Sequence, residues 1–242
     1  MRALSFAKRN FKEIIRDPLN LCFGIGFPVV LILLLSAIQS SIPVPLFEIQ
    51  SLTPGITVFG LAFMTLFTAT LISKDRSTSF LNRLYTTPLK PIDFILGYTL
   101  PIIPISILQS IICFMFAMIL GLDVSINIIL AILLMIPVSI LFISLGLLFG
   151  SILNDKQVGG ICGALLTNLT AWLSGAWFDL ELVGGAFKKI AYALPFVHAV
   201  EMERAVLVGN YGEIFTHLLV VLAYALVSLI LAVIFFLKQM KK

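Results

Sequence analysis

Long runs of apolar residues, separated by short polar connections, dominate the chain. Six of these runs reach the length of about 20 residues that a helix needs to cross a hydrocarbon layer about 30 Å thick. They cover residues 21–41, 55–73, 94–120, 126–151, 158–178 and 214–237. The pattern predicts an all-α polytopic membrane protein with six transmembrane helices, folded as a single domain over residues 1–242.

A basic amphipathic segment precedes the first run. With a period of 3.6 residues, one of its faces is apolar and the other is charged, which is typical of a helix lying in the membrane interface. The apolar face contains Leu4, Ala7, Phe11, Ile14 and Ile15, and the charged face contains Arg9, Lys12, Glu13 and Arg16. Pro18 ends this predicted interfacial helix, which covers residues 1–18. It serves either as a plain membrane anchor or as a contact for a partner protein.

The segment 179–212, between the fifth and sixth runs, is too short and too charged for two further crossings. An apolar stripe is followed by Pro195 and by a second helical stretch over residues 197–208. The stripe consists of Val183, Ala186, Phe187, Ile190 and Leu194. We predict a re-entrant hairpin of short helices in the outer leaflet, with its backbone polar groups buried against protein.

Composition supports a membrane protein, and the distribution of charge predicts its orientation. Apolar residues make up 60% of the chain and charged residues 12%, whereas soluble proteins contain about 25% charged residues. Of the 16 Lys and Arg residues, 13 fall on the side of the membrane that also holds both termini. The positive-inside rule makes this side cytoplasmic. The net charge of +4 therefore reflects topology, and nothing indicates nucleic-acid binding.

Prolines and glycines predict two local features of the spans. Pro101 and Pro104 predict a kinked or partly broken third span. Gly146 and Gly150 lie near the end of the fourth run, and the sequence GGICG opens the fifth. Small residues four apart let helices approach closely in lipid, so we expect these two glycine pairs to pack against each other.

The sequence contains no signature of catalysis. The chain has no Gly-Lys dipeptide, which excludes a Walker-type phosphate loop, and no His-Glu-x-x-His or Cys-x-x-Cys pattern. The interiors of the predicted spans hold no Asp, Glu, Lys or Arg, whereas ion-driven carriers need such groups near the membrane midplane. We interpret His198 and His217 as satisfied interfacial histidines. We therefore predict no catalytic, cofactor-binding or metal-binding residues in this chain.

Two uncharged stripes suit a path for an amphipathic compound. Phe59, Phe63 and Phe67 recur every four residues on one face of the second span. Asn168 and Trp172 form a similar stripe on the fifth span. An apolar wall with a few polar points is typical of a ligand site. The alternative is that these stripes face lipid or pack against other helices.

The connection after the second run, residues 74–97, is basic and patterned. Three apolar residues share one helical face, and three polar residues share another. The two faces consist of Phe80, Leu81 and Leu84, and of Arg76, Ser79 and Arg83. Pro88 ends this predicted helix, because the residue before a proline is disfavoured in the α region. A short, two-faced helix on the basic side of a membrane protein is suited to docking a partner.

This connection and the segment 173–209 together resemble the permease of the second type of ATP-binding-cassette (ABC) exporter, in its drug- and antibiotic-resistance branch. The connection matches that family at Asp75, Arg76, Phe80, Leu81, Arg83, Leu84, Thr87, Pro88 and Gly97. The second segment matches at residues 173–178, at Leu194-Pro195-Phe196, over residues 200–204 and at Gly209. Ser79, Asn82 and Asp179 stand where the family usually has glycine, an acid and proline.

The resemblance implies a dimer of permease subunits, identical or related, in the lipid of a bacterial cell membrane. One ABC ATPase would dock beneath each subunit and bind ATP and Mg²⁺, so that this chain itself would be no enzyme and would bind no cofactor. The implied ATPase-coupling residues are Asp75, Arg76, Phe80, Leu81, Arg83, Leu84 and Pro88, with Phe11, Lys12 and Arg16 of the interfacial helix. The implied substrate path contains Phe59, Phe63, Phe67, Asn168 and Trp172, and the outer hairpin contains Gly175, Pro195, Phe196 and Arg204.

The function expected from this resemblance is ATP-driven export of an amphipathic compound, such as a drug, an antibiotic or an antimicrobial peptide. Two alternatives remain open. Export of a lipid-linked polysaccharide uses the same topology within the same family. An ion-driven carrier or channel belongs to another class, and the uncharged interiors of the spans argue against it.

Overall fold

The computed structural model describes residues 2–78, 80 and 91–240, and every regular element in this part of the chain is a helix. The first half contains α1 (Arg2–Ile15), α2 (Pro18–Leu21), the π-helix η1 (Cys22–Gly26), α3 (Phe27–Gln39), α4 (Ile49–Ser77), α6 (Pro91–Thr99) and α7 (Ile102–Ile119). The second half contains α8 (Ile126–Ile152), α9 (Asp155–Val158), the π-helix η2 (Gly159–Leu166), α10 (Thr167–Leu173), α11 (Leu180–Val183), α12 (Gly185–Tyr192), α13 (Pro195–Val208) and α14 (Tyr211–Met240). The all-α prediction is confirmed.

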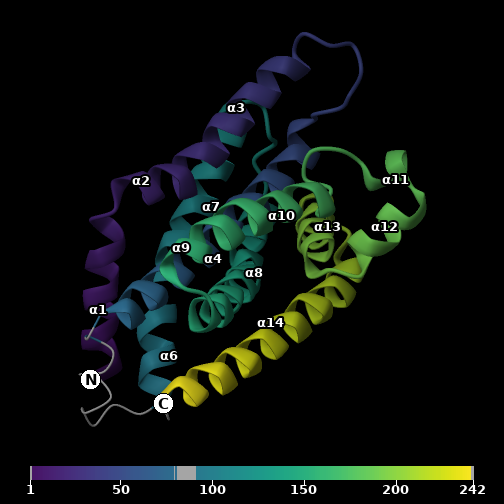
Figure 1. Cartoon of the computed structure of the whole chain (residues 1–242). Coiled ribbons are helices and arrows are strands. Elements are labelled where there is room, and N and C mark those ends of the chain that lie inside the picture. Colours follow the sequence, from purple (N-terminus) through teal and green to yellow (C-terminus); the bar gives the residue numbers. More distant parts are fainter. Residues whose placement is uncertain (1, 79, 81–90, 241–242) are drawn as a thin grey trace.

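Five helical stretches in the described part of the chain are long and apolar enough to cross a membrane. They are Pro18–Gln39, Ile49–Ser77, Ile92–Ile119, Ile126–Ile152 and Tyr211–Lys238. The predicted fifth run forms α9, η2 and α10 in succession and is not among them, so a sixth span stays a prediction. The helix α1 and the C-terminal end of α14 lie at the same end of the molecule (Figure 1), here called the α1 end. That this end is cytoplasmic also stays a prediction.

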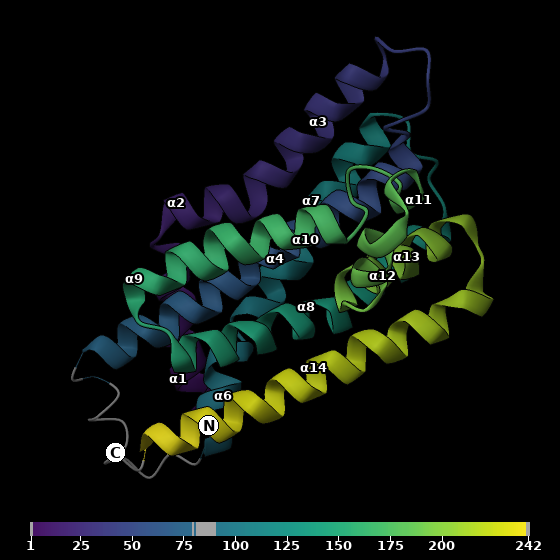
Figure 2. The ribbon, with the colours of Figure 1, turned by 45° about the vertical axis from the view of Figure 1, so that its right-hand side comes forward.

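The long helix α4 is the centre of the bundle and packs against α3, α7, α8, α13 and η2 (Figure 2). Its hydroxyl groups are satisfied inside this apolar environment. Thr53, Thr57 and Thr68 each donate to the carbonyl four residues earlier, at 2.6, 2.7 and 2.7 Å. Thr65 donates instead to the Phe142 carbonyl of α8 at 2.8 Å. The buried polar groups of α4 therefore carry no desolvation penalty from missing partners.

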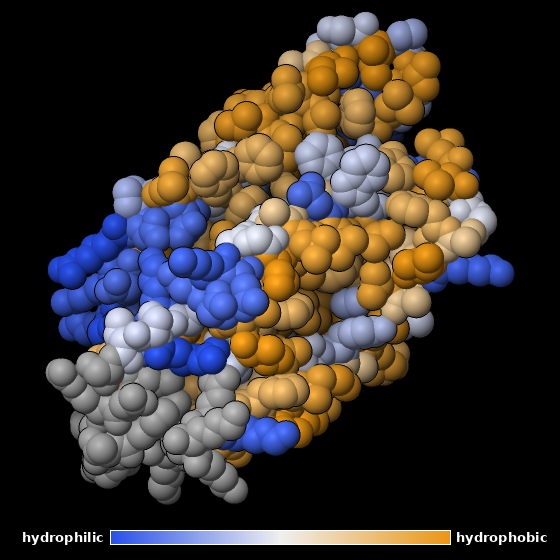
Figure 3. All heavy atoms as spheres, in the orientation of Figure 1, coloured by the Kyte–Doolittle hydropathy of each residue, from blue (hydrophilic) through white to orange (hydrophobic). Residues whose placement is uncertain are grey.

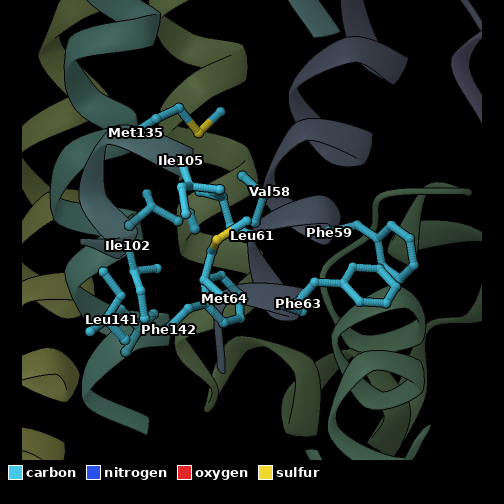
Figure 4. Packing of buried hydrophobic residues seen from close by; sticks show 14 of the residues in the cluster. Val58, Phe59, Leu61, Phe63, Met64, Ile102, Ile105, Met135, Leu141 and Phe142 are labelled. Carbon is cyan, nitrogen blue, oxygen red and sulfur yellow. The ribbon is translucent and has the colours of Figure 1, made fainter. Parts of the chain in front are cut away.

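The two sides of α4 serve different neighbours. Figure 4 shows Leu61 and Met64 on the side that faces Leu141, whereas Phe59 and Phe63 point to the opposite side. The first side joins the main hydrophobic core with α7 and α8. The second side carries the aromatic stripe predicted from the sequence.

The glycines of α8 pack against α4, so the expectation that they pack against the glycines of the fifth run is wrong. A Cβ on Gly146 would lie 2.5 Å from Thr68 Cβ, and one on Gly150 would lie 2.9 Å from Ala69 Cα. A Cβ on Gly159 would meet no atom within 4 Å. Both α8 and η2 pack on α4, and the small residues serve the approach of α8 to this central helix.

The predicted break in the third span is confirmed. The helix α6 ends at Thr99 and α7 begins at Ile102, with Pro101 at the junction. A proline lacks the amide hydrogen that a continuous helix requires at this point. The short helix α6 is thereby free to turn toward α1, on which it packs.

The helix α1 lies at the polar end of the molecule. Figure 3 shows hydrophilic side chains gathered there and hydrophobic ones over the long helices. The buried face of α1 contains Phe6, Ala7, Asn10 and Ile14, whereas Leu4 is 68% exposed and Ile15 is 51% exposed. The helix α6 covers the side of α1 that carries Phe6 and Asn10, and Leu4, Phe11 and Ile15 of the predicted apolar face are left exposed, so that this face meets lipid stays a prediction.

Candidate functional sites: a coupling cluster and an aromatic groove

Asp75, close to the C-terminal end of α4, joins three helices at the α1 end. Its Oδ2 accepts hydrogen bonds from Arg9 Nη1 of α1 at 2.7 Å and from Tyr98 OH of α6 at 2.9 Å. The Asp75 side chain is 5% exposed and that of Arg9 is 37% exposed. Water partly screens such a pair, so its main effect is to fix where α1 and α6 meet α4.

Aromatic rings surround this ion pair. Phe6 of α1 meets Tyr98 and Phe94 of α6 edge-on, with ring centroids 5.0 and 5.9 Å apart. The Arg9 guanidinium lies 4.4 Å from the centroid of the Phe80 ring, within cation–π range. Phe80, in the connection after α4, is therefore tied to α1 as well.

Gly97 allows α1 to approach α6 this closely. A Cβ at this position would lie 2.1 Å from Phe6 Cδ1, so any other residue here would displace the Phe6 ring that packs against α6. The Gly97 carbonyl also accepts a hydrogen bond of 2.9 Å from Asn10 Nδ2, which is buried. We call the whole group the Asp75 cluster; it consists of Phe6, Arg9, Asn10, Asp75, Phe80, Phe94, Gly97 and Tyr98.

Arg76 binds the end of another helix of the same chain. Its Nη1 donates to the carbonyls of Gly150 and Leu153 at 2.7 and 3.1 Å, at the C-terminal end of α8, where carbonyls lack partners within the helix. The expectation that Arg76 and Phe80 share one docking helix is wrong, because α4 ends at Ser77 and Thr78 is extended.

The other predicted coupling residues divide into two groups. Leu81, Arg83, Leu84 and Pro88 lie outside the described residues, so their role stays a prediction. Phe11, Lys12 and Arg16 are exposed on or just after α1. Arg16 lines a cavity of about 210 Å³ at the elbow between α1 and α2, here called the elbow cavity.

A larger cavity of about 420 Å³ lies between η1, α3, α4 and the η2–α10 stretch. Phe59 and Phe63 form one wall, and Phe27 meets them with ring centroids 6.1 and 6.2 Å away. Asn168 lies on the opposite wall, so the structure brings the two predicted stripes together. We call this cavity the aromatic groove; it is lined by Asn20, Phe23, Phe27, Phe59, Phe63, Leu66, Gly163, Thr167, Asn168, Ala171 and Trp177.

Two predicted path residues lie beside the groove. Phe67 packs against η1, where a Cβ on Gly24 would lie 2.4 Å from its Cζ, and it lines the elbow cavity. Trp172 is 57% exposed and lines a separate lateral cavity of about 370 Å³. Asn20 lines both the elbow cavity and the groove, which therefore adjoin.

The four predicted hairpin residues have identifiable structural roles. Pro195 begins α13, and Phe196 stacks on Phe142 of α8 with ring centroids 5.8 Å apart. Arg204 Nη2 donates to the Gly175 carbonyl at 2.8 Å, and its Nε donates to the Ser51 carbonyl at 3.2 Å. Arg204 thereby ties α13 to the segment after α10 and to the start of α4. That α12 and α13 enter the outer leaflet stays a prediction.

A third large cavity, of about 430 Å³, lies beside this hairpin and is here called the outer cavity. Its lining is polar, and its charged residues are mostly acidic, because four carboxylates face one guanidinium. The acidic residues are Glu48, Asp179, Glu181 and Glu201, and the basic residue is Arg204. Arg204 also pairs with Glu201 at 3.1 Å, which leaves the lining with a negative balance.

Glu203 is a buried acid that the sequence interpretation missed. Its side chain is fully buried in α13, and neither carboxylate oxygen has a hydrogen-bond partner among the described residues. Burial raises the pKa of Glu203 well above its ordinary value, because an apolar surrounding disfavours the charged carboxylate. The helical spacing from Phe196 through Val200 to Val206 places Glu203 on an apolar face and could have identified it.

The two histidines are partners of each other. His198 Nδ1 of α13 lies 2.9 Å from His217 Nδ1 of α14, and His198 Nε2 lies 3.0 Å from the Tyr192 carbonyl. Because a carbonyl only accepts, His198 carries its hydrogen on Nε2 and accepts at Nδ1 from His217. The interpretation of both as satisfied histidines is confirmed, and their bond joins the hairpin to α14.

The family described as ABC-2 type transporter matches residues 2–208. This range includes α1, the Asp75 cluster, the aromatic groove and α13. No curated protein matches the chain. The chain therefore belongs to the ABC-2 type transporter family, in which it is the permease component of an ABC transporter and not the ATPase. It is a multi-pass membrane protein.

Proposed function

We propose that this chain forms the translocation path of an ATP-driven exporter for an amphipathic compound, such as a drug, an antibiotic or an antimicrobial peptide. Two permease copies, identical or related, lie in a bacterial cell membrane with six spans each and both termini in the cytoplasm. Each copy docks one ABC ATPase, which binds ATP and Mg²⁺. The α1 end faces this ATPase, and the hairpin faces outward.

The aromatic groove is the observation that carries this proposal. Its volume of about 420 Å³ falls within the range of about 300–1,000 Å³ that is usual for small-molecule sites. Phenylalanine rings suit the apolar part of a ligand, while Asn168 and Thr167 offer polar contacts on the other wall. The elbow cavity adjoins the groove through Asn20, and the outer cavity adjoins it through Trp177. This row of cavities supports a path along one side of α4.

The Asp75 cluster supports a mechanism for coupling. The connection that is proposed to contact the ATPase leaves α4 just after Asp75 and Arg76, and Phe80 follows three residues after the end of α4 at Ser77. Because Asp75 and Phe80 are bound to α1 and α6, a force on the connection moves α1, α4 and α6 together. The opposite half of α4 carries Phe59 and Phe63, so closure of the ATPase would rearrange the groove as a rigid-body movement.

Transport in proteoliposomes tests this proposal. Vesicles that contain the chain and its co-purified ATPase should take up the amphipathic dye rhodamine 6G only when ATP is supplied outside. The variant Phe59→Ala/Phe63→Ala should lose this uptake, whereas Leu108→Ala, which changes an exposed residue on α7, should retain it. Uptake by the chain without ATPase would contradict the proposal, and ATP-driven movement of a lipid-linked polysaccharide alone would favour that alternative.

A further inference from the structure

Trp177 lies where three of the cavities meet. It lies in the segment between α10 and α11, and it lines the aromatic groove, the outer cavity and the lateral cavity. Among the residues that the structure describes, no other lines all three of these cavities. A compound that moves from the groove to the outer cavity therefore passes this side chain.

The backbone that leads into Trp177 is fixed at the two residues before it, Gly175 and Ala176. Gly55 of α4 lies so close that a Cβ there would be 2.7 Å from Ala176 Cα. The carbonyl of Gly175 is held by Arg204 at 2.8 Å. The Trp177 side chain can still rotate about its own χ angles without moving this backbone. The movable part of the junction is therefore the indole ring.

The indole is held by its ring and not by its N–H group. The ring meets Phe59 edge-on, with centroids 5.6 Å apart and an interplanar angle of 70°. Its Nε1 is buried and has no hydrogen-bond partner in the described part of the chain. A buried tryptophan N–H usually finds an acceptor, and a missing one costs about 1–3 kcal/mol. The packing of the indole against Phe59 is favourable, but it leaves the indole N–H without an acceptor, which is unfavourable.

We propose that Trp177 separates the groove from the outer cavity and selects the compounds that pass between them. Its indole rotates out of contact with Phe59 and donates its N–H to an acceptor on the compound. The ligand class is an aromatic or otherwise apolar compound that carries an exposed oxygen or nitrogen acceptor. This inference rests on the proposed function, because it concerns the ligand of the same path.

Passage past Trp177 selects between compounds with and without an acceptor. A compound without an acceptor gains only ring contacts, which Trp177 already makes with Phe59. A compound with an acceptor also satisfies the buried donor, and this favours the rotated indole because a ligand shifts an equilibrium by its differential affinity for the two states. Trp172 offers a comparison, since its indole lines only the lateral cavity among these three.

The experiment measures, for each of two multi-phenyl probes, the ratio of wild-type to variant affinity on the full chain in lipid nanodiscs, so that the charge difference between the probes cancels within each ratio. Triphenylphosphine oxide carries three phenyl rings and one strong acceptor, whereas tetraphenylphosphonium carries four phenyl rings and none. Trp177→Phe keeps a ring against Phe59 and removes the N–H. We expect it to weaken binding of the tritiated phosphine oxide about two- to tenfold and to change binding of the phosphonium less than twofold. Trp172→Phe should not reproduce this difference between the probes.

A direct readout accompanies the binding constants. The chain contains two tryptophans, so Trp172→Phe leaves Trp177 as the single emitter, and its fluorescence should change on addition of the phosphine oxide. Equal weakening of both probes by Trp177→Phe, no weakening of either, or no binding of the phosphine oxide to the wild type would overturn the assignment. These binding measurements need no ATPase. The role of Trp177 can therefore be judged separately from the proposed ATP-driven transport, even if that transport is not found.

Discussion

Removal of the Asp75 carboxylate should release α1 from the bundle. Asp75→Ala deletes the hydrogen bonds from Arg9 and Tyr98, at 2.7 and 2.9 Å. A hydrogen bond to a charged group contributes about 1.5–3 kcal/mol and a neutral one about 1 kcal/mol. Because Arg9 is 37% exposed and regains water, we place the total at the low end, at about 2–3 kcal/mol. This corresponds to an increase of about 30- to 150-fold in the opening equilibrium of α1.

Amide hydrogen exchange measures this opening locally. Exchange of the α1 amides should accelerate by about that factor in Asp75→Ala, while the amides of α8 stay protected. Tyr98→Phe removes one of the two bonds to the carboxylate and should accelerate the same amides only about tenfold, the low end for a hydrogen bond to a charged group. Asp123→Ala is the matched control, because Asp123 accepts only a weak, exposed bond of 3.3 Å from Gln50. Unchanged exchange of α1 in Asp75→Ala would refute the proposed role of the cluster.

Three further predictions concern the bundle and the hairpin. Gly150→Ala should lower the melting temperature in detergent by about 5 °C, because the added Cβ overlaps Ala69, whereas Gly160→Ala meets no atom within 4 Å and should change nothing. Arg204→Ala should lower it by about as much, since the carbonyls of Ser51 and Gly175 lose their donor; an unchanged melting temperature would contradict this role. The pKa of Glu203 is raised in the folded protein, so stability is lost as pH rises above the ordinary glutamate pKa of about 4.3. Glu203→Gln should therefore melt higher than the wild type at pH 8 and converge with it near pH 4, and a constant difference would refute the assignment.

The sequence predicted the elements better than their contacts. Apolar length alone located the five long helices, since a bilayer requires that length whatever the neighbours are. Pro101 likewise located the break between α6 and α7. The packing of Gly146 and Gly150 was assigned to the wrong partner, because small residues indicate a close approach without indicating which helix approaches.

The candidate sites were likewise predicted only in part, because a sequence pattern does not indicate which elements meet. Periodicity found Phe59, Phe63 and Asn168, and the structure places them on facing walls of one groove. Trp177 lies in a segment without regular helical periodicity, so no sequence pattern could predict its position at the junction of three cavities. Glu203 did carry a signal, because its spacing from Val200 and Val206 places it on an apolar face.

The most direct test of the central claim is affinity purification of the tagged chain from its native membrane, with mass spectrometry of the proteins that accompany it. The proposed function predicts recovery of an ABC ATPase with the wild type. It also predicts reduced recovery with Arg83→Glu, which is preferable to a change at Arg76 because Arg76 binds the end of α8. Recovery of no ABC ATPase with the wild type in a mild detergent would contradict the claim.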